Sequence, residues 1–441
     1  MTPAAARGFH RRGTEPRRLR GCHLGMTATI SRRTVLTLLA GAGAAALAGC
    51  EPARGRASAP AAGVPDPLLV QVDAGPALLR GTDRRTIPRA VASSDGAWIF
   101  ATAPEGPDTT CWRIDTTTGD TSAKTVLPGR WVPQVVSAEG TGVALTTTGA
   151  TANGGRPPGR TRTPVLVADV GGLRQRLDLP GNVVPEAFTA DRTGLFVLEW
   201  LPAAAPDRYR VRVVDLATGR PGPLSTRDKS PVPPGAEEEM RGDGRQAVLA
   251  PNRTVLYTLY THQPGHRHTR DLVSGRPGNA HAFVHTLNLL ERWAYCVDLP
   301  HPFGEAAAPG HAMAISPDGG RLLVADVASG TVADISTEEL AVRRTVPLAR
   351  GAGAAHAAAG PDRLFLAAGT TVRTLDLTRL TGTLDFPVRE PVSGLVAGRD
   401  GDRLYVGQRD SVSWHDPVTG RELGRVAVPG LVGVHGLAGS A

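Results

Sequence analysis

The chain has 441 residues, 49 of them basic and 41 acidic, and a formal net charge of +8. Residues 1–50 contain eight arginines and one acid, so they carry +7 of this charge and leave about +1 for the remainder. A nucleic-acid-binding protein needs clustered Lys and Arg to displace phosphate counterions, whereas basic and acidic residues are interspersed after position 50. The composition therefore excludes nucleic acid as an expected partner.

Residues 1–49 have the zones of an export leader in the required order: a basic stretch, an apolar stretch over 35–48, and small residues at a cleavage site. Met26 begins a leader of ordinary length, so residues 1–25 read as an upstream extension that need not be translated. Arg32 and Arg33, within Ser-Arg-Arg-Thr-Val-Leu, resemble the twin-arginine export signal, with Val in place of its usual Phe.

The sequence Leu47-Ala48-Gly49-Cys50 resembles the bacterial lipobox, in which the cysteine is diacylated and becomes the new N-terminus. A transmembrane anchor is the alternative, but the Ala- and Gly-rich apolar stretch is too short to cross about 30 Å of hydrocarbon. The resemblance implies a lipoprotein on the extracytoplasmic face of the cell membrane. Residues 50–66 then comprise the lipidated cysteine and a flexible tether.

From about position 67 to the C-terminus, one pattern recurs: a strand of small residues, an acidic turn, a β-branched strand, and two further strands. The clearest copy contains Ser316-Pro317-Asp318-Gly319. Steps of 38 to 66 residues separate the corner residues of seven units, which are Asp95, Glu139, Asp191, Asn252, Asp318, Asp362 and Asp400. This spacing is typical of four-stranded propeller blades.

The repeat resembles that of YVTN-type β-propellers, relatives of the WD and quinoprotein repeats, which implies an all-β propeller over 67–441. Residues 68–73 look like a second strand without an inner strand, and residues 432–437 like an inner strand without a blade. Pairing these ends would close the ring and remove both exposed edges. We expect eight blades, with seven as the alternative, and insertions at about 225–244 and 262–279.

Histidines suggest two candidate sites. His262, His266 and His268 crowd the second insertion, with His281 and His285 soon after, and histidine is a common metal ligand. This segment is a candidate site for Zn or Ca, and the alternative is a solvated loop.

The second candidate site consists of His311, His356 and His435, each expected to open an inner strand at one mouth of the channel. If these strands belong to adjacent units, three imidazoles converge on one ligand. The alternative is that each imidazole caps its strand by bonding backbone carbonyls of the next blade.

Other features argue against a redox cofactor and a disulfide. Three turns, at 115–119, 215–219 and 416–420, share the D-x-x-T-G spelling of quinoprotein repeats, but the docking Trp of those repeats is absent, so no quinone is expected. Cys111 and Cys296 are the cysteines left after cleavage and lipidation, and they lie in different units. We expect two separate buried thiols.

No short motif identifies a catalytic residue, because the nucleophile elbow, the zinc-protease motif, the P-loop and the dinucleotide fingerprint are all missing from the sequence. The expected function is that of a membrane-anchored, non-enzymatic scaffold that binds a protein or a small molecule. The alternative is a propeller-type hydrolase or lactonase, metal-dependent or not, with single catalytic residues on several blades.

Overall fold

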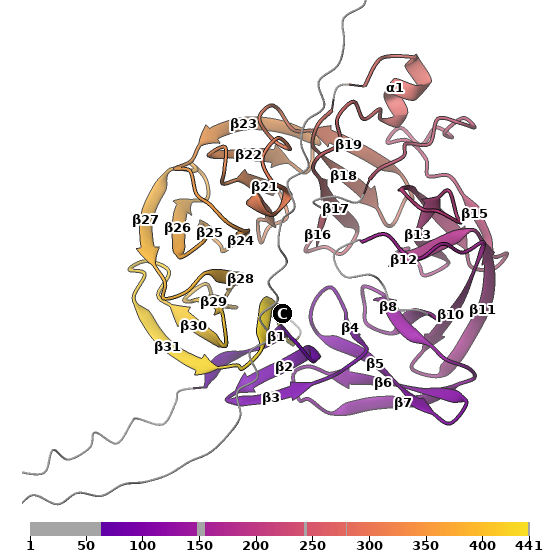
Figure 1. Cartoon of the computed structure of the whole chain (residues 1–441), viewed down its shortest axis with the longest axis horizontal. Coiled ribbons are helices and arrows are strands. Elements are labelled where there is room, and N and C mark those ends of the chain that lie inside the picture. Colours follow the sequence, from indigo (N-terminus) through magenta and orange to yellow (C-terminus); the bar gives the residue numbers. More distant parts are fainter. Residues whose placement is uncertain (1–62, 148–154, 242–244, 279, 440–441) are drawn as a thin grey trace, which may run out of the picture. The chain divides into compact units, whose positions relative to one another are not determined.

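The computed structural model describes residues 63–147, 155–241, 245–278 and 280–439. Eight four-stranded antiparallel sheets stand as blades around a central channel (Figure 1), which confirms the eight-bladed propeller predicted from the sequence. This part of the chain contains one α-helix, α1 (Thr269–Ser274), and one 3-10 helix, η2 (Ala308–Gly310). Neither helix is long and apolar enough to cross a membrane. Arg32, Arg33 and Cys50 lie outside the described residues.

In each blade the first strand lies at the channel and the fourth lies at the outer rim. Blade 1 contains β32 (Leu431–Leu437), β1 (Val64–Val72), β2 (Gly75–Gly81) and β3 (Asp83–Thr86). Blade 2 contains β4 (Ala90–Ala92), β5 (Trp98–Glu105), β6 (Asp108–Asp115) and β7 (Thr121–Leu127). Blade 3 contains β8 (Val132–Val136), β9 (Gly142–Thr146), β10 (Arg162–Asp169) and β11 (Gly172–Pro180). Blade 4 contains β12 (Asn182–Phe188), β13 (Gly194–Leu201), β14 (Arg208–Asp215) and β15 (Arg220–Gly222).

The second half of the ring follows the same order. Blade 5 contains β16 (Gln246–Leu249), β17 (Val255–Tyr260), β18 (Phe283–Asn288) and β19 (Ala294–Asp298). Blade 6 contains β20 (His311–Ile315), β21 (Arg321–Asp326), β22 (Thr331–Ser336) and β23 (Ala341–Pro347). Blade 7 contains β24 (Ala355–Ala359), β25 (Arg363–Ala368), β26 (Thr371–Asp376) and β27 (Gly382–Pro387). Blade 8 contains β28 (Val392–Ala397), β29 (Leu404–Gln408), β30 (Ser411–His415) and β31 (Glu422–Ala427).

The two ends of the propeller complete each other in blade 1. The C-terminal strand β32 pairs antiparallel with β1, and Val70 lies opposite Val434. Both side chains are buried, in a cluster that includes Tyr405 of blade 8. The predicted pairing of residues 68–73 with 432–437 is therefore confirmed, and it leaves neither end as an open sheet edge.

The corner between the first two strands of blade 6 shows why the acidic turn recurs. The Asp318 carboxylate accepts hydrogen bonds from the Ser316 hydroxyl and from the Gly320 backbone. Gly319 between them has a φ of 74°, a conformation in which a side chain would be strained. The Ser-Pro-Asp-Gly spelling thus determines a tight hairpin locally.

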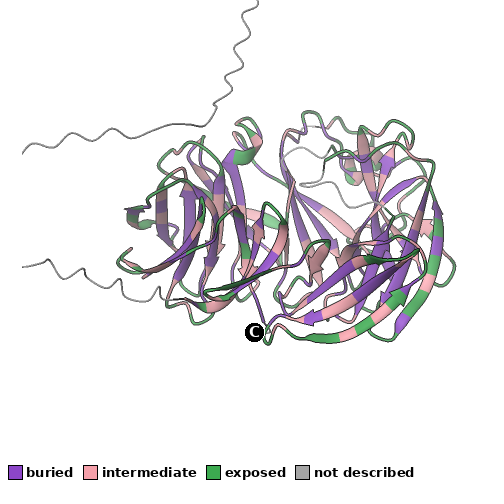
Figure 2. Ribbon diagram, turned by 60° about the horizontal axis from the view of Figure 1, so that its bottom comes forward, coloured by how far each residue is buried: buried purple, intermediate pink, exposed green. Residues whose placement is uncertain are grey.

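The hydrophobic core consists of layers between neighbouring blades, because each sheet packs on the next (Figure 2). The layer between blades 4 and 5 is rich in aromatic side chains. Trp200 and Tyr209 of blade 4 meet Tyr260 and Phe283 of blade 5, with ring centroids 4.8 to 6.2 Å apart along the row. Phe283, the last ring of this row, also contacts His266 and His268 of the second insertion.

The two insertions occur where the sequence predicts them. One connects β15 to β16 and the other connects β17 to β18. Helix α1, in the second insertion, lies at the periphery of the ring beyond blade 5 (Figure 1). The insertions therefore add a polar outer region to the side of the propeller at blades 4 and 5.

Candidate metal centre

A single carboxylate, that of Glu238, lies at the middle of a cluster of potential metal ligands. Its oxygens are 3.2 Å from His268 Nδ1, 3.3 Å from Cys296 Sγ, 3.6 Å from His285 Nε2 and 3.7 Å from His266 Nε2. The three histidine side chains are 3–4% exposed and that of Glu238 is 11% exposed. We call these five residues the Glu238 centre.

The first insertion holds Glu238 by tying its neighbours to blade 4. Met240 exchanges two backbone hydrogen bonds with Tyr209 at the start of β14. Glu237 forms ion pairs with Arg210 and Arg212 of the same strand. These contacts fix the backbone on both sides of Glu238 and leave its side chain directed at blade 5.

The second insertion supplies His266 and His268, and both imidazoles pack on Phe283. Their ring centroids lie 4.5 Å and 4.8 Å from that ring. His268 is also the residue before α1, and its backbone N–H donates to the Asp271 carboxylate. The contact with Phe283 therefore orients both histidines, and the start of α1 also positions His268.

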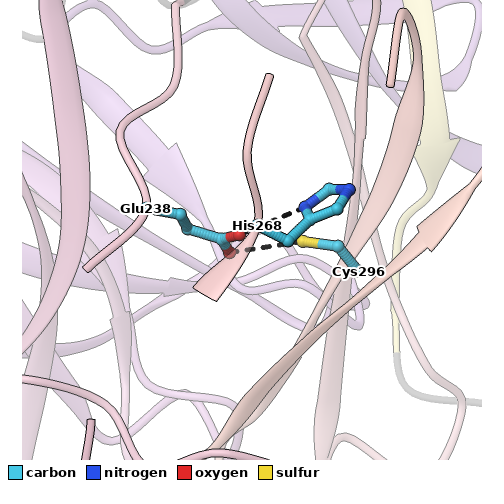
Figure 3. A group of neighbouring side chains, drawn as sticks. All are labelled: Glu238, His268 and Cys296. Atoms are coloured by element: carbon cyan, nitrogen blue, oxygen red, sulfur yellow. Dashed lines mark hydrogen bonds and ion pairs between the residues drawn. The ribbon is translucent and has the colours of Figure 1, made fainter. Parts of the chain in front are cut away.

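Blade 5 contributes His285 and Cys296 through the register of its outer hairpin. His285 on β18 lies directly opposite Cys296 on β19. Cross-strand partners project on the same face of a sheet, so both side chains point toward the Glu238 carboxylate. Figure 3 shows Glu238, His268 and Cys296 converging, with the thiol donating to a Glu238 oxygen.

A second layer of contacts orients His268. Its Nε2 lies 2.5 Å from Asp298 Oδ1, and Asp298 is held in turn by Arg270. A proton on Nε2 that is donated to Asp298 leaves the Nδ1 lone pair directed at the centre. Metal-binding histidines commonly have such a carboxylate behind them.

The cluster shifts the ionisation of its members strongly. Burial by itself raises the pKa of Glu238, but the neighbouring imidazoles of His266 and His268 outweigh it and hold the pKa well below its usual range. Burial lowers the pKa of His268, yet its bonds to Asp298 and Glu238 raise it to about 8. Burial lowers the pKa of His285 to about 4. Burial and the Glu238 charge raise the pKa of the Cys296 thiol well above its usual value. At neutral pH Glu238 is thus a carboxylate, His268 an imidazolium and His285 a neutral imidazole.

The distances from Glu238 to its neighbours resemble those between two ligands of one metal ion. Bonds of 2.0–2.3 Å in a tetrahedral zinc site place neighbouring ligand atoms about 3.3–3.8 Å apart. The separations from the Glu238 oxygens fall in or next to this range. His266 Nε2 is buried without a hydrogen-bond partner, which is costly for a polar atom unless another ligand satisfies it.

Among the described residues, two of the three insertion histidines proposed from the sequence thus come together. His266 and His268 are buried in the centre, so the alternative of a solvated loop does not hold for them. His262 instead lies 2.9 Å from the Thr261 hydroxyl, with its ring 6.3 Å from that of His311. Glu238, Cys296 and Asp298 were not identified from the sequence as site residues.

The hairpin of blade 5 contains one sequence signal that could have identified Cys296 as a site residue. A tight turn after Asn288, whose side chain accepts from the backbone of Leu290 and Glu291, sets the pairing of β18 with β19. Counting outward from that turn places residue 285 opposite residue 296. Glu238 has no such signal, because it is the middle of three consecutive glutamates.

The three channel histidines have separate environments. His311 is fully buried, and its Nε2 accepts from the Gly304 backbone. Burial lowers the pKa of His356, and a hydrogen bond to the Val392 backbone of the next blade opposes that effect. His435 is exposed.

The expected placement of these histidines in three adjacent units is wrong for His435. Blade 8, through β28, lies between β24 and β32. The bonding of His356 to the next blade fits the strand-capping alternative. The predicted separation of the two thiols is confirmed, since Cys111 and Cys296 are both buried and free.

Comparisons with known proteins add the fold alone. No profile of a known protein family matches the chain, and no curated protein matches its sequence. The structure of dihydro-heme d1 dehydrogenase NirN in complex with DHE matches with a TM-score of 0.50 and 11% identity, over 87% of this chain and 77% of that one. Two structures of AztD from Citrobacter koseri, one of them the apo form, match with TM-scores of 0.48 and 11% identity. They cover 85% and 83% of this chain and 98% and 96% of their own chains. At such identity, the NirN match indicates a shared propeller architecture.

Proposed function

We propose that this protein is a lipoprotein on the extracytoplasmic face of the membrane, anchored through Cys50, whose propeller binds a zinc-like divalent metal ion at the Glu238 centre. The twin-arginine pair Arg32 and Arg33 and the lipobox support export and anchoring. The similarity to YVTN-type repeats agrees with a rigid binding scaffold. On this proposal the lipid anchor keeps the metal-binding scaffold at the membrane surface.

The observation that carries the proposal is the Glu238 carboxylate, 11% exposed, among three buried imidazoles and a buried thiol. If the cluster served packing alone, one hydrogen-bond partner would be enough for the Glu238 carboxylate. Glu238 has two such partners, His268 and Cys296. His285 and His266 add two further nitrogens at 3.6 Å and 3.7 Å, and the His266 nitrogen has no other partner. Metal binding explains why so many donor atoms surround one carboxylate.

The chemistry of the donor set favours zinc over calcium. Calcium takes six to eight oxygen ligands, whereas the Glu238 centre offers mainly nitrogen and sulfur. Imidazole, thiolate and a single carboxylate are ligands that zinc prefers. Of the two ions considered from the sequence, the described residues support zinc.

A zinc titration tests the proposal. Metal-stripped protein is titrated with Zn²⁺ in competition with a chromogenic chelator, and we expect one ion per chain with a Kd below about 1 μM. Cys296→Ser and His268→Ala should each weaken binding at least about tenfold. Cys111→Ser is the matched control, because Cys111 is the other buried thiol and lies in blade 2. Zinc affinity that is unchanged in both centre variants would refute the proposal.

A further inference from the structure

A pocket of about 800 Å³ opens beside the Glu238 centre. Glu238, His268 and Cys296 all line this pocket, and their donor atoms lie within 4.8 Å of one another (Figure 3). His285 instead lines a cavity of about 30 Å³, and His266 lines a separate cavity of about 510 Å³. The large pocket therefore meets the centre at the face formed by Glu238, His268 and Cys296.

Three protein ligands leave a tetrahedral metal ion with one free position. Zinc ions held for structure have four protein ligands, whereas those that bind an external ligand have three and an open position. We infer that a metal ion held by Glu238, His268 and Cys296 keeps its fourth position open to this pocket and binds there the carboxylate of a small organic acid. This inference rests on the proposed metal binding and names the ligand class of the same site.

The walls of the pocket suit the apolar body of such an acid. Pro231, Pro233 and Tyr295 line it, together with Val273 on α1. Val273 is an apolar side chain, and it is 57% exposed. It therefore offers apolar surface to a ligand in the pocket. The volume lies in the usual range for small-molecule sites, which are mostly apolar with a few polar groups that fix orientation.

Charges near the metal favour an anionic head group. The guanidinium groups of Arg227 and Arg270 lie 5.6 Å and 5.5 Å from the centre of the Tyr295 ring. Arg227 donates to backbone carbonyls of blade 6, so its charge is not cancelled by a carboxylate in those bonds. Asp228 is the other acid of the pocket besides Glu238, and it accepts from the hydroxyls of Thr226 and Ser230. A divalent ion balanced by Glu238 and a Cys296 thiolate then leaves the carboxylate of a ligand beside the Arg227 guanidinium, whereas Arg270 is paired with Asp298.

Cobalt spectroscopy tests the inference, because Co²⁺ replaces Zn²⁺ and its visible bands report the ligand set. The protein is loaded with Co²⁺ and titrated with acetate and with benzoate, which share a carboxylate and differ in the apolar ring. Both anions should shift the d–d bands, and benzoate should bind about tenfold more tightly because its ring covers apolar wall. The variant Val273→Asp should abolish the preference for benzoate and leave cobalt binding unchanged.

Leu290→Asp is the matched control, since Leu290 is 56% exposed and does not line the pocket, so this variant should keep the benzoate preference. Cobalt bands that ignore saturating acetate and benzoate would overturn the inference alone, because the fourth position would then be filled, by His266 or His285. Equal affinities for the two anions would also overturn it. Absence of a sulfur-to-cobalt charge-transfer band would refute the metal site itself, and the inference with it.

Discussion

His268 Nε2 and Asp298 Oδ1 are 2.5 Å apart, and this contact joins the residue before α1 to the last residue of the outermost strand of blade 5. It fixes the direction of the His268 ring, and with it the position of the nitrogen that faces Glu238. Asp298 is thus a positioning residue, which touches no other member of the Glu238 centre in these contacts. Its effect on metal binding is separable from that of the ligands.

Replacing Asp298 with Asn should weaken zinc binding by about tenfold to a hundredfold, although all five residues of the centre remain. The pKa of His268, read by NMR, should fall from about 8, because the Asp298 hydrogen bond is one of the causes that raise it. Asp385→Asn is the control: its side chain is 55% exposed, as against 50% for Asp298, and it also pairs with an arginine. A variant that loses stability but keeps both zinc affinity and the His268 pKa would contradict the positioning role.

Zinc affinity should rise steeply with pH. Binding displaces one proton from the Cys296 thiol, whose pKa is well above its usual value, and one from His268, whose pKa is about 8. Each displaced proton contributes about tenfold per pH unit below the pKa of its group, so affinity should increase about a hundredfold from pH 6 to pH 7. Competition titrations at several pH values measure this slope. In Cys296→Ser it should fall to about tenfold per unit, and an unchanged slope would contradict the assignment.

The free protein should respond to pH through the same histidine. The folded-state pKa of His268 is raised to about 8 from an ordinary value near 6.5, so protonation stabilises the folded state. This stabilisation is fully present below pH 6.5 and is lost as pH rises through 8. Denaturation of the metal-free protein between pH 6 and pH 9 measures the loss, which should disappear in His268→Ala.

Closure of the ring through β1 and β32 predicts a sharp contrast between two neighbouring valines. Val434 is 5% exposed and packs in the closing layer, whereas Val432 on the same strand is 53% exposed. Val434→Asp buries an unpaired charge and should lower the thermal midpoint by about 5 °C or more. Val432→Asp should change it by less than about 1 °C. Equal shifts in calorimetry would argue against closure by this strand.

The three channel histidines should differ in their effect on stability. His311→Ala removes a fully buried side chain that accepts from the Gly304 backbone, and it should lower the thermal midpoint by about 3–6 °C. His435→Ala removes an exposed side chain and should leave the midpoint unchanged within about 1 °C. Similar shifts for the two variants would contradict their different environments.

Anchoring stays a prediction from the sequence, and two variants test it. Cys50→Ala should release the protein from membrane fractions, because the thiol is the attachment point of the lipid. Replacing Arg32 and Arg33 with Lys should block export. Cys111→Ser serves as the control, because it removes another cysteine and should leave fractionation unchanged. Cys50→Ala protein that still sediments with membranes would contradict the lipobox assignment.

The sequence by itself determined the architecture, because its signals are local. The corner that contains Asp318 and Gly319 forms a hairpin through contacts between neighbouring residues. The number of such corners in the sequence indicates the number of blades. Residues 68–73 and 432–437 each lack a pairing strand close by in the sequence. Their pairing with each other could therefore be predicted. Periodicity and turn chemistry extend over a few residues, which is the range that a single sequence reveals.

Only the tertiary structure decided the centre. Glu237, Glu238 and Glu239 are indistinguishable in the sequence, yet the first pairs with arginines of β14, the third pairs with Arg208, and Glu238 faces the histidines. Its partner Cys296 comes from a strand that follows 58 residues later. The two insertions pack against the layer between blades 4 and 5, and this packing brings these groups together. Which of the three glutamates faces the histidines depends on burial and charge in the folded chain.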